Sequence, residues 1–357
     1  MRHSPGVKER LRPGASTTPE GNVMHGLAGS PPEEARDLDA PLSPANRHGH
    51  GQGHLSLRYQ TSFANPIHCR GVALHSGHEV NLALLPAPAG FGICFQRTDL
   101  PGSPLIPALY DHVIDTRLST VIGVADAPHI RVATIEHLMA ALHANHITNA
   151  LITLDGPETP VFDGSSAAFD FLIRCAGRQN LGAPCPIISV KRVVRVTGLH
   201  GAFAELRPQE GAFSLSVSID FSAQAIGFQH RDITLSEAIF RRDICESRTF
   251  VNMKEIEALR KAGLAKGGSL DNAVVVDGAK ILNEGGFRYQ DECARHKILD
   301  AIGDMYLTGA PIEGQFVGYK CGHDINNRLL RAVFADKANW RAISPLHGVN
   351  APLHAVA

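Results

Sequence analysis

The chain lacks three patterns that would each have indicated a class of protein. Its seven cysteines form no Cys-x-x-Cys pair, and their odd, scattered arrangement argues against a disulfide framework and against a cysteine zinc site. No run approaches the 18 apolar residues of a transmembrane helix, so no transmembrane segment is expected. Lysine and arginine number 34 against 35 aspartate and glutamate residues, a balance that gives no case for nucleic acid or an anionic membrane as partner.

The first 54 residues have few large apolar side chains. Residues 1–54 are rich in Pro, Gly, Ser and His, so we expect a disordered extension that cannot offset its ordering entropy by burial. The segment has no apolar core of a signal peptide, and we expect the protein to be cytoplasmic. Its histidines at 48, 50 and 54 could bind metal loosely, which would add to another function without replacing it.

From about residue 56 the pattern becomes that of a folded protein. In the first half we expect strands at 61–69, 80–86, 91–97 and 151–154 and helices at 135–142 and 166–176. After a linker at 177–186, we expect strands at 187–196, 202–207 and 214–221 and helices at 253–262 and 292–306. Each half runs from strands to helices, which predicts an α+β duplication with domains at 55–183 and 187–345.

The predicted helix at 292–306 carries a possible metal site. His296 and Asp300 are four residues apart, so they lie roughly 40° apart around the helix axis. An imidazole nitrogen and a carboxylate oxygen in this arrangement can bind one ion. The spacing also occurs by chance in many helices, so the pattern alone leaves a purely structural role open.

The start of the predicted helix at 135–142 offers matching chemistry. Thr134 is expected to be its N-cap, followed by Glu136 and His137. A single-metal hydrolase needs protein ligands that leave one zinc position open for water, and a nearby carboxylate that takes the proton of that water. The alternative is a buried histidine beside a glutamate that interacts favourably with the helix dipole.

A third segment places His323 directly after Gly322. The glycine predicts a tight turn, so the imidazole is expected at the edge of an element. There it could act as a general acid or, as a cation, stabilise an oxyanion. A solvent-facing loop histidine is the alternative, and with 19 histidines in the chain a single one carries little weight.

Together these segments resemble the UDP-3-O-acyl-N-acetylglucosamine deacetylase family, the zinc amidases of lipid A biosynthesis. The resemblance extends from about residue 59 to 336 and rests on four motifs in order: GVALHSG at 71–77, TIEHLM at 134–139, RHKILDAIGD at 295–304 and GHDINN at 322–327. Shorter agreements lie at 160–165 and 247–250.

The resemblance implies two similar α+β domains, each a sheet plus a helix layer, with the helices between the two sheets. It also implies a small insertion in each domain, at about 105–123 and 252–281. In the family the second insertion helps to form an apolar tunnel for the 3-hydroxyacyl chain of the substrate. The valines at 274–276 suit that wall, and an ordinary buried strand is equally consistent with them.

For the reaction centre, the resemblance implies one catalytic Zn²⁺ held by His137, His296 and Asp300. It places the general base on Glu136 and the imidazole acid or electrostatic stabiliser on His323. The reaction implied is hydrolysis of the N-acetyl group of an acylated UDP-sugar, releasing acetate and a free amine. Either His323 or Glu136 could protonate the leaving amine.

Four further roles follow from the resemblance. Thr249 would hydrogen-bond the developing oxyanion, and Phe250 would stack on the sugar. Asp304 would orient the catalytic histidine, and Lys297 would lie near the diphosphate of the substrate.

Two positions and two rival functions stay open. Asp163 is a possible partner of the site or a turn-forming residue, and His75 has a turn or packing role as its alternative. A zinc amidase for another acylated sugar and a non-catalytic binding module are the rival functions. No obligate protein partner is evident in the sequence.

Overall fold

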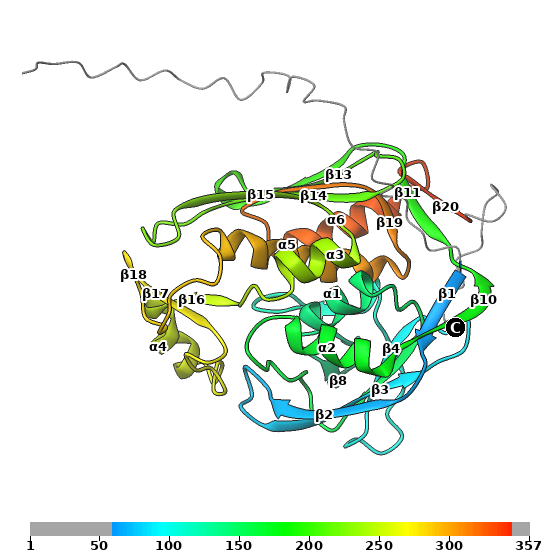
Figure 1. The fold of residues 1–357 in the computed structure, drawn as a ribbon, viewed down its shortest axis with the longest axis horizontal. Helices are drawn as coiled ribbons and strands as arrows, with labels where there is room; N and C mark the ends of the chain where they lie inside the picture. Colours follow the sequence, from blue (N-terminus) through cyan, green and yellow to red (C-terminus); the bar gives the residue numbers. More distant parts are fainter. Residues whose placement is uncertain (1–58, 345–357) are drawn as a thin grey trace, which may run out of the picture. The chain divides into compact units, whose positions relative to one another are not determined.

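Two β-sheets flank a layer of helices in the computed structural model, which describes residues 59–344 (Figure 1). Helices α1 (Glu136–Ala144) and α5 (Glu292–Met305) pack against each other at the centre of that layer. This arrangement confirms the predicted α+β class with helices sandwiched between sheets. The extension expected at 1–54 lies outside the described residues.

The first sheet has five strands. Their order across the sheet is β2 (Ile67–Val72), β3 (Glu79–Pro86), β9 (Ala150–Leu154), β4 (Ile93–Arg97) and β5 (Ile106–Pro107). Strand β4 runs parallel to β9, and the other neighbours are antiparallel. In β3, alternate residues Val80, Leu82 and Leu84 are buried, which is the period of a strand with one face on a core. Helix α2 (Ala167–Ala176) contacts β2.

The second sheet has seven strands. Five of them follow the order β12 (Val194–Thr197), β13 (Phe203–Arg207), β19 (Ile312–Tyr319), β11 (Ile187–Val190) and β20 (Trp340–Ile343). Strand β14 (Phe213–Asp220) pairs in parallel with β19 and antiparallel with β15 (Phe228–Thr234). Helix α5 packs on β14 and β15, while α6 (His323–Ala335) packs on β12 and β13. The second half therefore repeats the sheet-and-helix layering of the first.

The crossing of α1 and α5 depends on one glycine. Every residue of α1 is buried, so the helix has no face toward solvent. A Cβ atom at Gly303 of α5 would lie 2.0 Å from the backbone oxygen of Glu136, a distance that only glycine avoids. The close approach places the first turn of α1 against the last turn of α5.

Each half also carries a small three-stranded sheet, in the regions where insertions were predicted. One contains β6 (Val113–Asp115), β7 (Val121–Val124) and β8 (Ala127–Val132), and the other β16 (Phe250–Asn252), β17 (Val274–Asp277) and β18 (Lys280–Ile281). The first sheet ends at Val132, nine residues beyond the limit predicted at 123, because β8 returns antiparallel along β7. Helix α4 (Met253–Lys261) follows β16. Shorter helical segments complete the path: η1 (Tyr110–His112), η2 (Leu199–Gly201), α3 (Glu237–Ile239), η3 (Phe240–Ile244) and η4 (Tyr306–Thr308).

The linker predicted at 177–186 is wrong. Residues of that stretch form β10 (Arg178–Pro184), which pairs antiparallel with β1 (Tyr59–Phe63). Its glycines and prolines indicated a loop, but the pairing partner lies more than a hundred residues earlier and gives no local signal. The domain limits at 55–183 and 187–345 remain predictions.

Three smaller predictions also need correction. The single strands predicted at 61–69 and 187–196 are each two strands, broken at 64–66 and 191–193. Thr134 is not the N-cap of α1: it adopts φ 58°, its hydroxyl donates to Glu158, and Ile135 occupies the cap position. The Thr134 hydroxyl therefore bonds a glutamate outside the helix instead of a backbone N–H of the first turn of α1.

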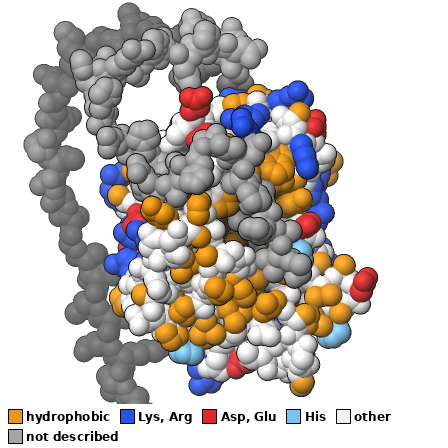
Figure 2. All heavy atoms as spheres, turned by 90° about the vertical axis from the view of Figure 1, so that its right-hand side faces the viewer, with side chains coloured by type: hydrophobic (Ala, Val, Ile, Leu, Met, Phe, Trp, Pro, Cys, Tyr) orange, Lys and Arg blue, Asp and Glu red, His pale blue; other side chains and the backbone are white. Residues whose placement is uncertain are grey.

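The surface is mixed in charge. Figure 2 shows the side of the molecule toward β1 and β10, where basic and acidic side chains both lie among hydrophobic ones. Within residues 59–344, no helix combines the length and the apolar character needed to cross a membrane.

Candidate metal centre and active site

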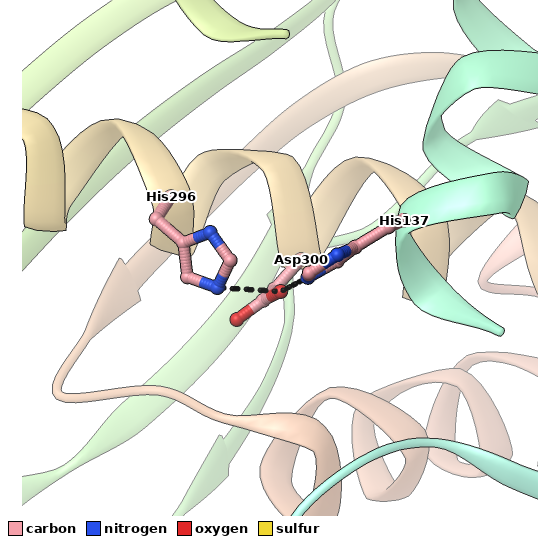
Figure 3. A group of neighbouring side chains, drawn as sticks. All are labelled: His137, His296 and Asp300. Carbon is pink, nitrogen blue, oxygen red and sulfur yellow. Dashed lines mark ion pairs between the residues drawn. The ribbon is translucent and has the colours of Figure 1, made fainter. Parts of the chain in front are cut away.

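Three side chains from the two halves of the chain converge beside the crossing of α1 and α5. His137 comes from α1, and His296 and Asp300 come from successive turns of α5 (Figure 3). Asp300 Oδ1 lies 3.5 Å from His137 Nε2 and 3.4 Å from His296 Nε2. Among the described residues this is the one group whose three donor atoms lie within 4.8 Å of one another. The structure thus brings together the three residues that the sequence predicts as metal ligands.

The protonation states of the group suit a cation. Burial lowers the pKa of His296 to about 4, against the opposing charge of Asp300, so this imidazole is neutral near pH 7. Burial alone would raise the pKa of Asp300, but its electrostatic interactions with His296 and Lys297 hold it well below its usual value. The Nδ1–H of His296 donates to the carbonyl of Ser247 at 3.1 Å, which leaves the Nε2 lone pair facing Asp300.

One buried atom of the group lacks a partner. Asp300 is 2% exposed, and no donor among the described residues hydrogen-bonds its Oδ1. The other oxygen, Oδ2, accepts from Lys297 Nζ at 2.7 Å. A buried carboxylate oxygen without a donor is costly unless something else neutralises it. The neutral imidazole of His296, the imidazole of His137 and this free oxygen therefore fit a zinc ion, which prefers nitrogen and oxygen ligands.

A second pair of titratable groups lies next to the metal group. The Glu136 carboxylate is buried at the start of α1, and its Oε1 lies 3.8 Å from His323 Nε2. The Nδ1–H of His323 donates to Asp304 Oδ2 at 2.9 Å, so Nε2 is the ring nitrogen facing Glu136. Burial raises the pKa of Glu136, although the nearby His323 charge opposes this. Asp304 therefore contacts the histidine that it was predicted to orient, and its orienting role in catalysis stays a prediction.

His323 does not lie in a solvent-facing loop. It is the first residue of α6, and its side chain is 10% exposed. Burial alone would lower the pKa of His323, but the charges of Asp304 and Glu136 raise it to about 9. The imidazole is therefore a cation near pH 7, as a proton donor requires.

The predicted substrate-binding residues lie beside the metal group. The Phe250 ring stands edge-on to His296 at 6.0 Å between centroids, and Lys297 Nζ lies 5.8 Å from the Phe250 ring centre. Lys297 also lines a cavity of about 780 Å³ together with His323 and Arg328. In this structure the lysine contacts Asp300, so its predicted place near a diphosphate stays a prediction.

Thr249 is positioned through its backbone. Its N–H donates to Gly164 O at 2.8 Å, and its carbonyl accepts from Val274 N at 2.8 Å. Gly164 has φ +82°, and a Cβ atom there would lie 2.0 Å from a backbone oxygen of Asn272, so this close contact requires glycine. The Thr249 side chain lines an apolar cavity, and its predicted contact with an oxyanion stays a prediction.

That apolar cavity has a volume of about 410 Å³. It lies between the small sheet containing β16 and β17, helix α4 and the N-terminal half. Most of its lining is aliphatic or aromatic, and includes Leu74, Phe250, Val251, Ile256, Leu259 and Val275. Val274 and Val276, the neighbours of Val275, are fully buried. The valine run predicted for the second insertion therefore forms a buried strand with one side chain on the cavity.

A buried ion pair holds the segment before Thr249. Glu292 is 0% exposed and accepts from Arg248 N at 3.0 Å and from Arg248 Nε at 2.8 Å. Its other oxygen accepts from Arg288 N at 2.6 Å and Arg248 Nη2 at 3.0 Å. Because Glu292 begins α5, this pair fixes Ser247 and Thr249 relative to the helix that carries His296. Sequence reasoning missed Glu292, since a charged residue at a helix start usually indicates only a favourable dipole interaction.

We expect Glu292→Gln to destabilise the protein strongly. The variant leaves the buried Arg248 cation without its counter-charge, which costs about 3–5 kcal/mol in free energy of unfolding. Urea unfolding followed by circular dichroism measures the loss. Glu257→Gln is the matched control, because Glu257 pairs with Lys261 on an exposed helix face, where such a pair contributes about 0.3–0.5 kcal/mol. Equal changes in the two variants would contradict the role of Glu292.

The two undecided residues have structural contacts. Asp163 Oδ1 accepts from the N–H and hydroxyl of Ser165, and its Oδ2 accepts from Arg288 at 2.8 Å. These bonds favour the turn-forming role. The backbone N–H of His75 donates to Glu158 at 2.8 Å, and its side chain lines the apolar cavity.

The comparisons with known proteins agree with this architecture. A family profile described as UDP-3-O-acyl N-acetylglycosamine deacetylase matches residues 60–335. The chain belongs to this family. A UDP-3-O-acyl-N-acetylglucosamine deacetylase of Acidithiobacillus ferrooxidans is 46% identical over 291 residues, covering 80% of this chain and 92% of the relative.

Relatives from other bacteria bear the same name. The protein of Myxococcus xanthus is 44% identical over 274 residues, covering 77% of this chain and 86% of its own length. That of Shewanella oneidensis is 42% identical over 297 residues, covering 83% and 96%. The matched residues include both halves of the candidate site.

Proposed function

We propose that this protein hydrolyses the N-acetyl group of UDP-3-O-(3-hydroxyacyl)-N-acetylglucosamine, releasing acetate and the free amine for lipid A biosynthesis. Membership of the deacetylase family supports the reaction and the substrate. The observation that carries the proposal is the buried His137–His296–Asp300 group beside the Glu136–His323 pair.

Zinc is the proposed cofactor, with one ion per chain held by His137, His296 and Asp300. When bound, it would lower the pKa of a coordinated water toward 7 and polarise the amide carbonyl. The unpartnered Oδ1 of Asp300 and the neutral His296 support this assignment. We therefore propose more specifically that this deacetylase is a zinc-dependent amidase.

The remaining residues supply proton transfer and positioning. Glu136 is the proposed general base that takes the proton of the attacking water, since its carboxylate is buried next to His137. His323, a cation near pH 7, stabilises the oxyanion and can protonate the leaving amine, a task that the Glu136 carboxyl could also perform. Asp304 holds the Nδ1–H of His323 and so directs Nε2 toward Glu136.

The apolar cavity supports an acylated substrate. Its aliphatic lining fits a hydrocarbon chain, and Phe250 lies both on its wall and against His296. An acyl chain bound there would place the attached sugar near the metal group. Thr249 as oxyanion donor and Lys297 as diphosphate contact complete the proposal.

Acetate release tests this function. The full chain is incubated with UDP-3-O-acyl-GlcNAc and, in parallel, with UDP-GlcNAc that lacks the acyl chain. We expect acetate from the acylated compound and a large loss of kcat/KM without the acyl chain. Equal rates on both would favour an amidase for another sugar, and no acetate from either would favour the non-catalytic binding module.

The alkaline side of the pH profile reports His323. Because the imidazolium gives up its proton as the pH rises through about 9, kcat is expected to fall there in the wild-type protein. His323→Ala is expected to lose about 10²–10⁴ in rate and to lack this alkaline limb. His112→Ala, an exposed histidine paired with Asp111, should keep the wild-type profile. An unchanged limb in His323→Ala would refute the acid role.

Location and partners stay predictions. A cytoplasmic site of action fits a nucleotide-sugar substrate, and no protein partner is required by the proposed chemistry. Measuring activity in fractionated cells tests the location.

A further inference from the structure

Thr120 lies where the two halves of the site meet. It directly precedes β7 and is 2% exposed. Its backbone N–H donates a hydrogen bond to Glu136 Oε2 at 3.0 Å. Its carbonyl oxygen accepts a hydrogen bond from the backbone N–H of Ile135, with 3.4 Å between nitrogen and oxygen. The backbone of Thr120 is therefore attached to the start of α1 and to the proposed general base.

The side chain of the same residue reaches the other half. Thr120 Oγ1 lies 2.5 Å from Asp304 Oδ1 on α5 and donates to it. It also lies 3.2 Å from His323 Nδ1 on α6. One threonine thus contacts the carboxylate of the base, the carboxylate that orients the histidine, and the histidine itself.

The partners of Asp304 show what the hydroxyl contributes. Asp304 Oδ2 accepts from His323 Nδ1 at 2.9 Å and from Asn326 Nδ2 at 2.8 Å. Among the described residues, the Thr120 hydroxyl is the one donor to Oδ1. A buried carboxylate oxygen that loses its donor is costly, so the side chain would reorient to recover one. Such a rotation would move Oδ2 away from the histidine ring.

We propose that Thr120 is a positioning residue that fixes Asp304, and through it His323, relative to Glu136. This role rests on the proposed function. It adds to that function a residue that contacts both the proposed base, Glu136, and the proposed acid, His323, which come from different halves of the chain. Groups one contact removed from a reaction centre typically change its activity by about 10- to 100-fold when replaced.

Thr120→Val is the variant that tests the role. Valine keeps the volume and the backbone N–H to Glu136 and removes only the hydroxyl. We expect kcat for acetate release to fall by about 10- to 100-fold, with KM and zinc content unchanged. Thr120→Ser restores the donor and should recover most of kcat, which a merely space-filling role would not require.

The control is a buried threonine away from the site. The Thr308 hydroxyl donates to the carbonyls of Met305 and Ala310, and the residue is 5% exposed. Thr308→Val should keep the wild-type kcat. A double-mutant cycle completes the test, because Thr120→Val should cost little further rate in an Asp304→Asn background if the hydroxyl acts through Asp304.

The outcomes separate this role from the function on which it rests. A wild-type chain that releases no acetate overturns both. An active wild type with unchanged kcat in Thr120→Val, the same loss in Thr308→Val, or no recovery in Thr120→Ser overturns the role of Thr120 alone. If Thr120→Val does not melt cooperatively, Thr120→Cys, a weaker donor of similar volume, is measured instead under the same criteria.

Discussion

His296→Ala is expected to abolish zinc binding and, with it, acetate release. The three donors come from two helices that cross at Gly303, so removing one imidazole leaves a histidine and a carboxylate on different elements. Catalytic zinc sites use three protein ligands, so we expect the two remaining donors to lose the ion during dialysis. In the proposed mechanism the bound metal would supply both the activated water and the carbonyl polarisation, so the rate should fall to background.

Zinc analysis after dialysis, with acetate release on the same sample, measures this effect. His143 provides the matched control, because it is another buried histidine and stacks on Tyr306 at 4.3 Å. His143→Phe keeps the stacked ring and should retain zinc and activity. A His296→Ala protein that holds stoichiometric zinc and turns over normally would show that the ligand assignment is wrong.

Glu136→Gln is expected to lower kcat by about 10²–10⁴ while the protein keeps its zinc. Glutamine preserves the side-chain shape and can still accept the hydrogen bond from Thr120 N, so the change isolates proton transfer. The burial that raises the pKa of Glu136 makes its carboxylate a stronger base than an exposed glutamate.

Steady-state kinetics with zinc analysis on the same preparation separates two explanations. Loss of zinc together with rate would make Glu136 a metal ligand. A rate within a few-fold of the wild type would remove it from the mechanism. Only a slow enzyme with full zinc content fits a general base.

The proposed metal ligands could be predicted because their arrangement is partly local. His296 and Asp300 are four residues apart in the sequence, so helix geometry places their side chains on the same face. In the motif at 134–139, Glu136 and His137 are adjacent in the sequence. The resemblance to a family then joined the two segments. Their convergence, however, depends on the close crossing at Gly303, which no local pattern shows.

The residues that sequence reasoning missed, Thr120 and Glu292, have hydrogen-bond partners far away in the sequence. Thr120 lies 184 positions from its partner Asp304, and Glu292 lies 44 positions from its partner Arg248. A buried threonine or glutamate in a short segment has no composition or spacing that distinguishes it from a solvent-facing one. The same reason explains β10, whose loop-like composition concealed its pairing with β1.

Anomalous diffraction at the zinc edge, from crystals of the full chain, tests the central claim most directly. We predict one anomalous peak between α1 and α5, within about 2.0–2.2 Å of His137 Nε2, His296 Nε2 and one oxygen of Asp300. A zinc-loaded protein with no peak at this position, or with these three side chains too far apart to share an ion, would contradict the account.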